Sequence, residues 1–273
     1  MGNHFNAIWE RNIVRSSQKY FEARGAPLHA ISTKKLEKHI RARTVLLSIR
    51  LSTYLAAYGI IGKLIEDTRQ RKCSDLMSGD AITILALLKE GILDAADLID
   101  LRYADHVRNI DKPNAPGLVE DFGLGKAVTL KPHPLQNPGL ELQPIATLLH
   151  SGFTLDRKLV IPIEISLRGK CSNDPRTMKF NHCGTKDPLT FEKILEIIAR
   201  NGAKQLILAD SPWEGHATTN ETELKRHLET TSASSGWVIK SWYWLEDTKT
   251  YVAQLGPVHT IGSELVKEKI IQI

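Results

Sequence analysis

The chain has 273 residues, of which 42% are hydrophobic and 25% charged, a composition that excludes wholesale disorder and is typical of a soluble globular protein. The apolar stretch between Arg50 and Lys63 is too short to span a membrane, which needs ~20 residues. The N-terminus lacks the basic-then-apolar order of a secretory signal, and three cysteines are too few for a disulfide framework. We therefore expect a cytoplasmic protein without membrane contact.

The net charge of +5 is unevenly distributed along the chain. Residues 1–72 contain 14 Lys and Arg against 5 Asp and Glu, whereas the remainder contains 22 against 26. A basic segment of this kind suggests an anionic partner, although charged residues that merely solvate helix faces produce the same pattern. The candidate nucleic-acid contacts lie in the run TKKLEKHIRAR and are Lys34, Lys35, Lys38, Arg41 and Arg43.

The first 110 residues show mainly helical patterns. Hydrophobic residues recur at helical spacing from Phe5 to Ile13, and AITILALLKEG is preceded by Asp80 as a potential N-cap and ends at Gly91. The stretch DAADLIDLRYADHV is predicted to form a further short helix. Residues 111–144 then contain six prolines and four glycines, which predicts a loop-rich connector and a domain boundary.

Residues 145–273 alternate between strand and helix patterns. Strands are predicted at 159–166, 204–210 and 237–244, and helices at 188–200, 219–231 and 245–255. This alternation predicts an α/β fold, with a Rossmann-like parallel sheet and flanking helices. The predicted organisation is a mainly helical basic region (1–110), a connector (111–144) and a Rossmann-like domain (145–273).

Two of these predicted strands end in polar clusters. The first runs into Ser166 and the sequence LRGK, and the second ends at Asp210 and continues as SPW. In open α/β sheets, ligands bind beyond the carboxyl ends of the strands, so both clusters are candidate sites. Taken alone, Ser166 has no G-x-S-x-G turn around it and suits a structural role better than a catalytic one. His182 lies before a capped helix and is a candidate acid–base group.

No cofactor or metal is expected from the motifs. Neither GLGK nor SLRGK has the spacing of a phosphate loop, and G-x-G-x-x-G is absent, which argues against a dinucleotide. Cys171, His182, Cys183 and His216 do not have the spacing of a zinc site. The tryptophans at 237, 242 and 244 suit a half-buried strand better than a stacking surface for bases.

One longer pattern combines PIEISLRGK, a helix with FEKILEIIAR, a strand with ILADS, a polar helix and W-x-x-x-x-W-x-W. Over about 85–100 residues, estimated from the extent of these matched elements, it resembles the tRNA-dependent cyclodipeptide synthases. Their fold is similar to the catalytic domain of class I tyrosyl- and tryptophanyl-tRNA synthetases. The resemblance implies a reaction that joins the amino acids of two aminoacyl-tRNAs through a serine ester, without ATP.

The resemblance also implies roles for individual residues. Ser166 would accept the aminoacyl group. The residues that would bind the substrate are Arg168, Gly169, Lys170, Asn173, Asp210, Ser211 and Trp213. The chain ends at Ile273, before the family's later tyrosine, glutamate and histidine. Either these residues are lost, or the N-terminal helices supply replacements, for which the candidates are His39, Tyr54, Tyr58 and Glu66.

Three functions therefore remain open from the sequence. The first is aminoacyl-tRNA-dependent acyl transfer, with aminoacyl-tRNA or another anionic nucleic acid as the partner. The second is a non-catalytic protein that binds tRNA or another nucleic acid on a degenerate Rossmann fold. The third is a small-molecule Rossmann enzyme such as a methyltransferase. Amino-acid specificity and oligomeric state cannot be inferred from the sequence.

Overall fold

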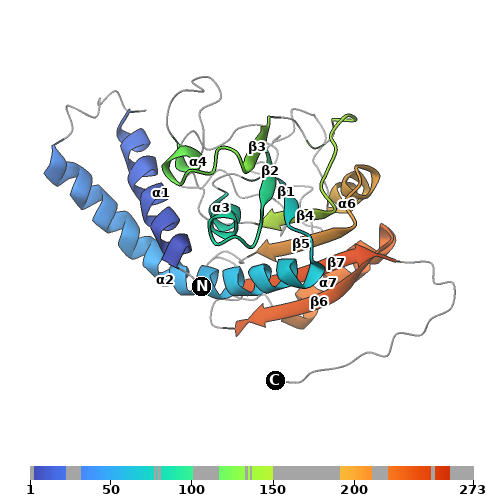
Figure 1. The fold of residues 1–273 in the computed structure, drawn as a ribbon. Coiled ribbons are helices and arrows are strands. Elements are labelled where there is room, and N and C mark those ends of the chain that lie inside the picture. Colours follow the sequence, from blue (N-terminus) through green and yellow to red (C-terminus); the bar gives the residue numbers. More distant parts are fainter. Residues whose placement is uncertain are drawn as a thin grey trace.

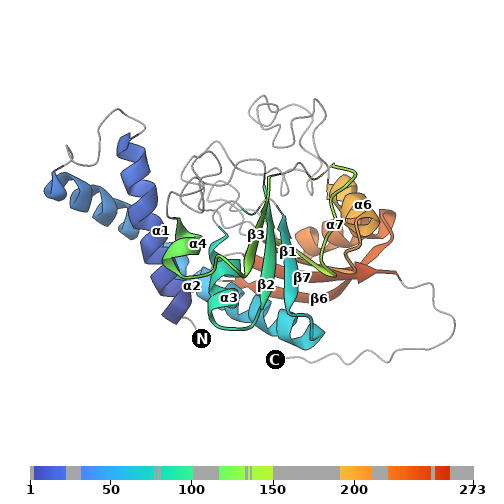
Figure 2. The ribbon, with the colours of Figure 1, turned by 45° about the horizontal axis from the view of Figure 1, so that its top comes forward.

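The computed structural model describes residues 3–22, 32–76, 78, 81–100, 117–132, 135, 137–149, 191–210, 221–246 and 250–258. These residues form a seven-stranded sheet with helices on both faces (Figures 1 and 2). The strands are β1 Lys72–Leu76, β2 Ala95–Ile99, β3 Val128–Lys131, β4 Ile145–Leu149, β5 Gln205–Asp210, β6 Trp237–Leu245 and β7 Thr250–Pro257. The helices are α1 Asn3–Glu22, α2 Thr33–Thr68, α3 Ile82–Lys89, α4 Leu118–Asp121, α6 Phe191–Arg200 and α7 Glu221–Ser234. The predicted Rossmann-like α/β class is confirmed.

The order of the strands is β3-β2-β1-β4-β5-β7-β6. The pairs among β1 to β5 are parallel, whereas β7 runs antiparallel to both β5 and β6. From β1 the chain first builds the sheet outward through β2 and β3, and then returns to place β4 on the other side of β1. This reversal makes the β1/β4 boundary the topological switch point, the place where open α/β sheets bind ligands.

Several predicted elements of the C-terminal region are observed. Strands β5 and β6 and helices α6 and α7 lie close to the predicted positions, while the strand predicted at 159–166 lies outside the described residues. The helix predicted at 245–255 is wrong, because Thr250–Pro257 forms β7. Pairing with β5 and β6 makes this segment a strand. Its side chains alternate between the two faces of the sheet: Tyr251, Ala253 and Leu255 enter the core beside α6 and α7, and Val252 enters the core on the opposite face.

The helix predicted over DAADLIDLRYADHV is wrong in its described part, because β2 lies there, and β1 is a further strand within the region predicted as helical. The sheet therefore takes strands from both sides of the Pro/Gly-rich stretch 111–144. Short apolar strands that are covered on both faces lack a clear period and resemble buried helix. The prediction for α3 is closer: Gly91 follows its end with φ +73°, and its N-cap is Ala81. Asp80, the predicted N-cap, lies outside the described residues.

The N-terminal helices pack against one face of the sheet. Helix α2 contacts β7, β5 and β6, and α1 contacts both α2 and α3. Phe5 of α1 and Tyr58 of α2 meet at 5.0 Å between ring centroids, and both side chains are buried. With 36 residues, α2 is ~54 Å long, and its N-terminal half extends beyond the sheet together with α1 (Figure 1).

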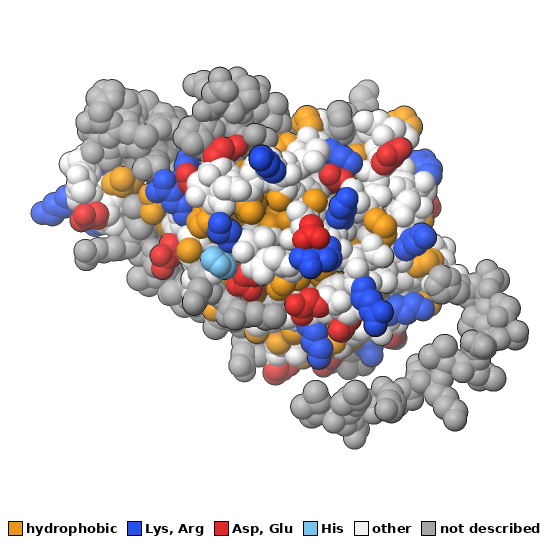
Figure 3. All heavy atoms as spheres, viewed as in Figure 1, with side chains coloured by type: hydrophobic (Ala, Val, Ile, Leu, Met, Phe, Trp, Pro, Cys, Tyr) orange, Lys and Arg blue, Asp and Glu red, His pale blue; other side chains and the backbone are white. Residues whose placement is uncertain are grey.

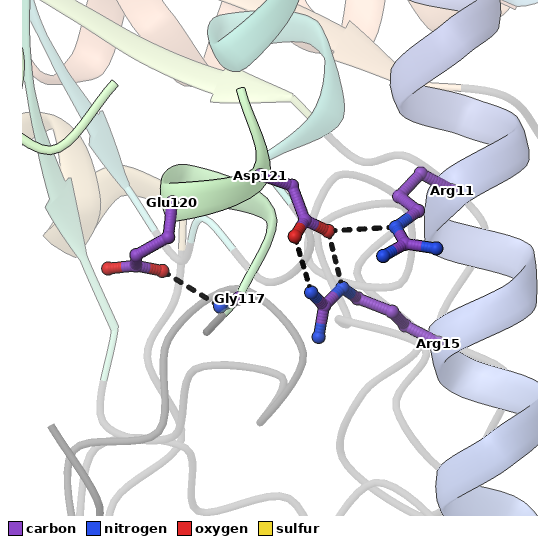
Figure 4. A network of polar contacts seen from close by, with 5 residues as sticks. All are labelled: Arg11, Arg15, Gly117, Glu120 and Asp121. Carbon is purple, nitrogen blue, oxygen red and sulfur yellow. Dashed lines mark hydrogen bonds and ion pairs between the residues drawn. The ribbon is translucent and has the colours of Figure 1, made fainter. Parts of the chain in front are cut away.

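Helix α1 is tied to α4 by an ion-pair cluster (Figure 4). The Arg15 guanidinium donates to both carboxylate oxygens of Asp121, from Nε at 2.7 Å and from Nη2 at 2.6 Å. Arg11 adds a third hydrogen bond through Nε at 2.9 Å. Burial alone would raise the pKa of Asp121, but the hydrogen bonds and charges of Arg15 and Arg11 outweigh it and lower that pKa.

Replacing Asp121 by asparagine should detach this cluster and lower the free energy of unfolding by about 1–2 kcal/mol at pH 7. The reason is the loss of charge-assisted bonds at a carboxylate whose side chain is 18% exposed. Since the folded pKa of Asp121 is depressed, its contribution is present above the unfolded pKa of ~4 and is lost as the pH falls through the folded value. Urea unfolding at pH 7 and pH 3 measures the difference, which should shrink at pH 3.

The matched control is Asp94→Asn, which breaks an exposed pair with Arg71 and should change stability by less than about 0.5 kcal/mol. Equal effects of the two substitutions at pH 7 would show that the Asp121 cluster contributes no more than an ordinary surface pair.

Candidate functional site at the carboxyl edge of the sheet

A buried carboxyl group lies at the switch point. Asp75 is the fourth residue of β1 and pairs in register with Thr147 of β4. The side chain of Asp75 is 2% exposed, and Thr147 Oγ1 donates a hydrogen bond of 2.7 Å to its Oδ1. Among the described residues of β1 and β4, Asp75 carries the one carboxyl group at the boundary between the two strands, and both strands hold it in place.

The surroundings of Asp75 oppose its ionisation. Burial raises its pKa to about 7, the hydrogen bond from Thr147 partly offsets this, and the charge of Asp100 raises the pKa further. The neighbouring thiol of Cys73 has a raised pKa too, from burial first and then from the charges of Asp75 and Asp97. A buried carboxyl group with a pKa near neutrality at a ligand-binding edge is typical of a functional group.

The turn between β1 and α3 brings a hydroxyl group to the same edge. Ser78 is buried, and its backbone N–H donates to the Ile99 carbonyl at the end of β2. Within the described residues its Oγ has no hydrogen-bond partner. A buried hydroxyl without a partner is energetically unfavourable, and a hydrogen bond to a polar ligand would remove that cost. Ala81 closes the turn in a left-handed conformation, with φ +50°, where glycine is the usual residue.

A second acidic residue follows the neighbouring strand. Asp100 comes directly after β2, its backbone N–H donates to the Lys131 carbonyl at 3.4 Å, and its side chain lies close enough to raise the pKa of Asp75. In Rossmann folds that bind nucleosides, an acidic residue at this place, about 20 residues after the first turn, accepts hydrogen bonds from the ribose hydroxyls. Asp100 occupies that position in this chain.

A polar network on the face of the sheet opposite the Asp75 side chain fixes the strands around the switch point. The Gln143 backbone N–H donates to Ser74 Oγ at 2.9 Å, and its side-chain amide donates to Asp97 Oδ2 at 3.0 Å. Lys131 Nζ forms an ion pair with the same Asp97 oxygen at 3.0 Å. The network joins β1, β2, β3 and the segment that enters β4, so it holds Asp75 and Thr147 in register.

Most of the residues predicted as site residues lie outside the described part of the chain. This group comprises Ser166, Arg168, Gly169, Lys170, Asn173, His182, Ser211 and Trp213. Asp210 is the last residue of β5 and pairs with Tyr251 of β7, so its backbone reaches the carboxyl edge as predicted. Among the suggested replacement residues, Tyr58 is a core residue packed on Phe5, and Glu66 is exposed.

The predicted nucleic-acid contacts lie at the start of α2. Lys34, Lys35 and Lys38 are exposed, and the helix begins at Ser32, whose Oγ accepts from the Lys35 backbone N–H at 3.3 Å. Arg41 and Arg43 follow within the same helix. Over the sheet domain, the face seen in Figure 3 intersperses basic and acidic side chains.

Sequence reasoning missed Asp75, Thr147, Ser78 and Asp100. A signal was present: KCSDL and AADLI are five-residue strands, and each is followed by a polar turn. Ser78 and Gly79 stand where a glycine-rich turn is expected, and Asp100 lies at the expected distance from them. Only one glycine remains in that turn, so a search for G-x-G-x-x-G does not find it.

The described residues show neither a metal cluster nor a membrane-spanning helix. They contain no group of three or more His, Cys, Asp or Glu side chains that could hold a metal ion. No helix among them is long and apolar enough to cross a membrane.

No protein-family model matches the chain, and no curated protein matches its sequence. Solved structures do resemble it in fold. The N,N-8-amino-8-demethyl-D-riboflavin dimethyltransferase RosA from Streptomyces davawensis has a TM-score of 0.50 and 10% identity, over 91% of this chain and 68% of that one. TrmK from M. capricolum, in complex with S-adenosylhomocysteine, has a TM-score of 0.40 and 14% identity, and the match covers 74% of this chain and 67% of TrmK.

A protein of the NADB-Rossmann superfamily from Streptococcus agalactiae has a TM-score of 0.39 and 13% identity. That match covers 71% of this chain and only 64% of the other protein. At these identities the likeness concerns the fold alone.

The similarity to RosA contradicts the resemblance to cyclodipeptide synthases, and with it the prediction of aminoacyl transfer through Ser166. RosA, at the TM-score of 0.50, is a methyltransferase. The topology gives the physical reason: the segment after the tryptophans of β6 forms the antiparallel strand β7 instead of leading to catalytic helices. The described residues form a Rossmann-like fold of seven strands, six of them parallel, and this fold is similar to that of RosA.

Proposed function

We propose that the chain is a methyltransferase whose methyl donor is S-adenosylmethionine, bound at the carboxyl edge of β1, β2 and β4. The observation that carries the proposal is the pair of acidic residues at the ends of adjacent strands, Asp75 on β1 and Asp100 after β2. The strand order with an antiparallel β7 and the similarity to RosA support it. This is the small-molecule Rossmann alternative of the sequence analysis, and it replaces the expectation that no cofactor is used.

The described residues suit the chemical groups of this donor. It carries a ribose diol, an ammonium group, a carboxylate and a sulfonium, and it supplies a methyl group activated by the sulfonium charge. Asp100 can accept hydrogen bonds from the ribose hydroxyls. The unpartnered Ser78 hydroxyl can donate to the carboxylate. The Asp75 carboxyl group can balance a cation in a site from which water is excluded.

The turn after β1 departs from the usual glycine-rich form. Gly79 is its only glycine, and Ala81 occupies the left-handed position with its methyl group buried. Glycines in such turns let a ligand approach the backbone closely. We therefore assign more of the binding to the side chains of Ser78 and Asp100 in this chain than to backbone contacts.

The experiment that tests the proposal is methyl transfer from S-adenosylmethionine labelled on its methyl group. The purified chain is incubated with total RNA and, separately, with a small-molecule extract, and the label is counted in each fraction. Transfer by the wild type that is lost with Asp100→Ala supports the proposal. Absence of transfer to either fraction, together with absence of donor binding by folded protein, would refute it.

We propose a nucleic acid as the anionic partner of the basic N-terminal region. Lys34, Lys35 and Lys38 are exposed on the part of α2 that projects beyond the sheet. By helical spacing, residues 34, 38 and 41 share one face, opposite the stripe that includes Leu36 and the buried Tyr58. A row of lysines on a projecting helix can follow phosphates while the sheet presents the catalytic edge.

Replacing Lys34, Lys35 and Lys38 together by glutamine should weaken RNA binding and its dependence on salt. If each lysine contacts one phosphate of a single strand, the slope of log K against log salt should fall by about 2, because each contact contributes ~0.7. Fluorescence anisotropy with a labelled RNA between 50 and 300 mM salt, about a sixfold range that resolves such a slope, is the measurement.

The matched control removes the same charge from the sheet domain, by Lys126→Gln, Lys204→Gln and Lys240→Gln, all at exposed positions. An equal loss of slope in both triple variants would show a nonspecific effect of net charge and no docking site on α2.

A further inference from the structure

We propose that Asp75 couples ligand binding at the switch point to proton release: the site takes up the cationic amino-acid end of its ligand as the Asp75 carboxyl group gives its proton to solvent. The inference rests on the proposed function, since it concerns the same ligand. It adds a regulatory property, a dependence of binding on pH in the neutral range.

The position of Asp75 gives the first argument. Its carboxyl group is held between the two strands that flank the switch point, through the 2.7 Å hydrogen bond from Thr147 Oγ1 to Oδ1. That bond engages Oδ1, and in the proposed site the second carboxyl oxygen holds the proton or faces the ligand. The adjacent turn carries the unpartnered Ser78 hydroxyl, so the polar groups in need of a ligand lie together at the end of β1.

The charges around Asp75 give the second argument. From β1 its titratable neighbour is Cys73, and the acidic residue whose charge acts on Asp75 is Asp100, directly after β2. Thr147 of β4 is polar but uncharged, and α3 contributes buried apolar side chains. Lys131 is engaged with Asp97 on the opposite face. Among the described residues, no Lys, Arg or His side chain forms an ion pair or hydrogen bond with Asp75.

These surroundings determine what binding requires. A carboxylate in such a place is costly because burial and the charge of Asp100 both oppose ionisation. A ligand ammonium group supplies the missing positive charge and favours the ionised form. The balance is one proton released for one cation bound, and no other reactant is needed.

The expected size of the effect follows from a pKa of about 7 for Asp75 without ligand. Only the ionised fraction binds productively, so the apparent Kd should fall about tenfold between pH 6 and pH 8 and change little above pH 8. At pH 7 about half a proton should be released per ligand bound.

The test is calorimetric titration with S-adenosylhomocysteine, which carries the ammonium group, in two buffers of different ionisation enthalpy at each pH. 5′-Methylthioadenosine serves as the control ligand, because it keeps the nucleoside and lacks the amino-acid end. The expected result is a tenfold tightening with proton release for S-adenosylhomocysteine, and binding independent of pH for methylthioadenosine. In Asp75→Asn the proton release should vanish and the affinity for S-adenosylhomocysteine should be flat with pH.

Thr147→Val provides a second variant, should Asp75→Asn fail to fold. It removes the hydrogen bond that favours the ionised form, so the midpoint of the pH dependence should move upward. Binding of S-adenosylhomocysteine that is independent of pH, or a pH dependence unchanged in these variants, would overturn the inference and leave the proposed function standing. If neither ligand binds folded protein at any pH, the proposed function itself fails, and the inference fails with it.

Discussion

Replacing Asp75 by asparagine should abolish a pH dependence of stability. In the wild-type protein the free energy of unfolding should fall as the pH rises from 4 to 7, and in Asp75→Asn this fall should be absent. The pKa of Asp75 is about 7 in the folded protein and ~4 in the unfolded chain. Over this range the folded state binds more protons, so the free energy of unfolding falls as the pH rises. The stabilising contribution of the protonated form is complete below pH ~4 and is lost by pH ~7.

The expected size is large because Asp75 is fully buried. A difference of about three pKa units corresponds to about 4 kcal/mol, at 1.36 kcal/mol per unit. Asparagine has the same shape and can accept the hydrogen bond of Thr147, but it cannot ionise. The stability of Asp75→Asn relative to the wild type should therefore increase by up to about 4 kcal/mol from pH 4 to pH 8.

Urea unfolding across this pH range, followed by circular dichroism, measures the effect. Asp94→Asn is the control, because Asp94 is exposed and its removal should leave the pH profile unchanged. Parallel pH profiles of the wild type and Asp75→Asn would contradict the assignment of Asp75 as a buried group that titrates near neutrality.

The second large effect is expected for Asp100→Ala, which should weaken the binding of S-adenosylhomocysteine about 100-fold. If Asp100 accepts two hydrogen bonds from the ribose, their loss at a charged acceptor is worth about 3 kcal/mol, or about two powers of ten in Kd. Asp100 is partly exposed at the end of β2, so folding should change little. Calorimetric titration gives the ratio of dissociation constants, and thermal unfolding checks the fold.

The matched control for this substitution is Asp94→Ala, which makes the same change just before the other end of β2. Its affinity should equal that of the wild type. An Asp100→Ala protein that is folded and binds as tightly as the wild type would remove Asp100 from the site.

The sequence predicts the C-terminal part of the fold well where its patterns are long or strongly periodic. Helix α6 has a stripe formed by Phe191, Ile194, Leu195 and Ile198, all of which are buried. Strand β5 is a short apolar run after the turn at Gly202, and β6 is rich in aromatic residues. These features are sufficient to indicate a Rossmann-like sheet.

The N-terminal strands could not be separated from helix in the same way. In β1 and β2 both faces of the strand are covered, so Cys73, Ser74, Asp75 and Leu76 are all buried and no alternation is visible. Strand β7 was missed because its partners β5 and β6 precede it in the chain. Only tertiary pairing makes a strand of that segment.

The candidate site depends on the same strands, and the sequence patterns therefore do not reveal it. The principle that ligands bind at the carboxyl edge points to Ser166 and Asp210 in the sequence, whereas the described residues bring Asp75, Ser78 and Asp100 to the carboxyl ends of β1 and β2. The register between β1 and β4 places Thr147 beside Asp75, although the two residues are 72 positions apart in the sequence. Periodicity carries no information on such a pairing.

The most direct test of the account is a crystal structure of the wild-type chain with S-adenosylhomocysteine at pH 8. The predicted result is ligand density beyond the carboxyl ends of β1 and β2, with the ribose on Asp100 and the amino-acid end toward Ser78 and Asp75. Density at another edge of the sheet, or well-ordered crystals without ligand density at saturating concentration, would contradict a donor site at the switch point.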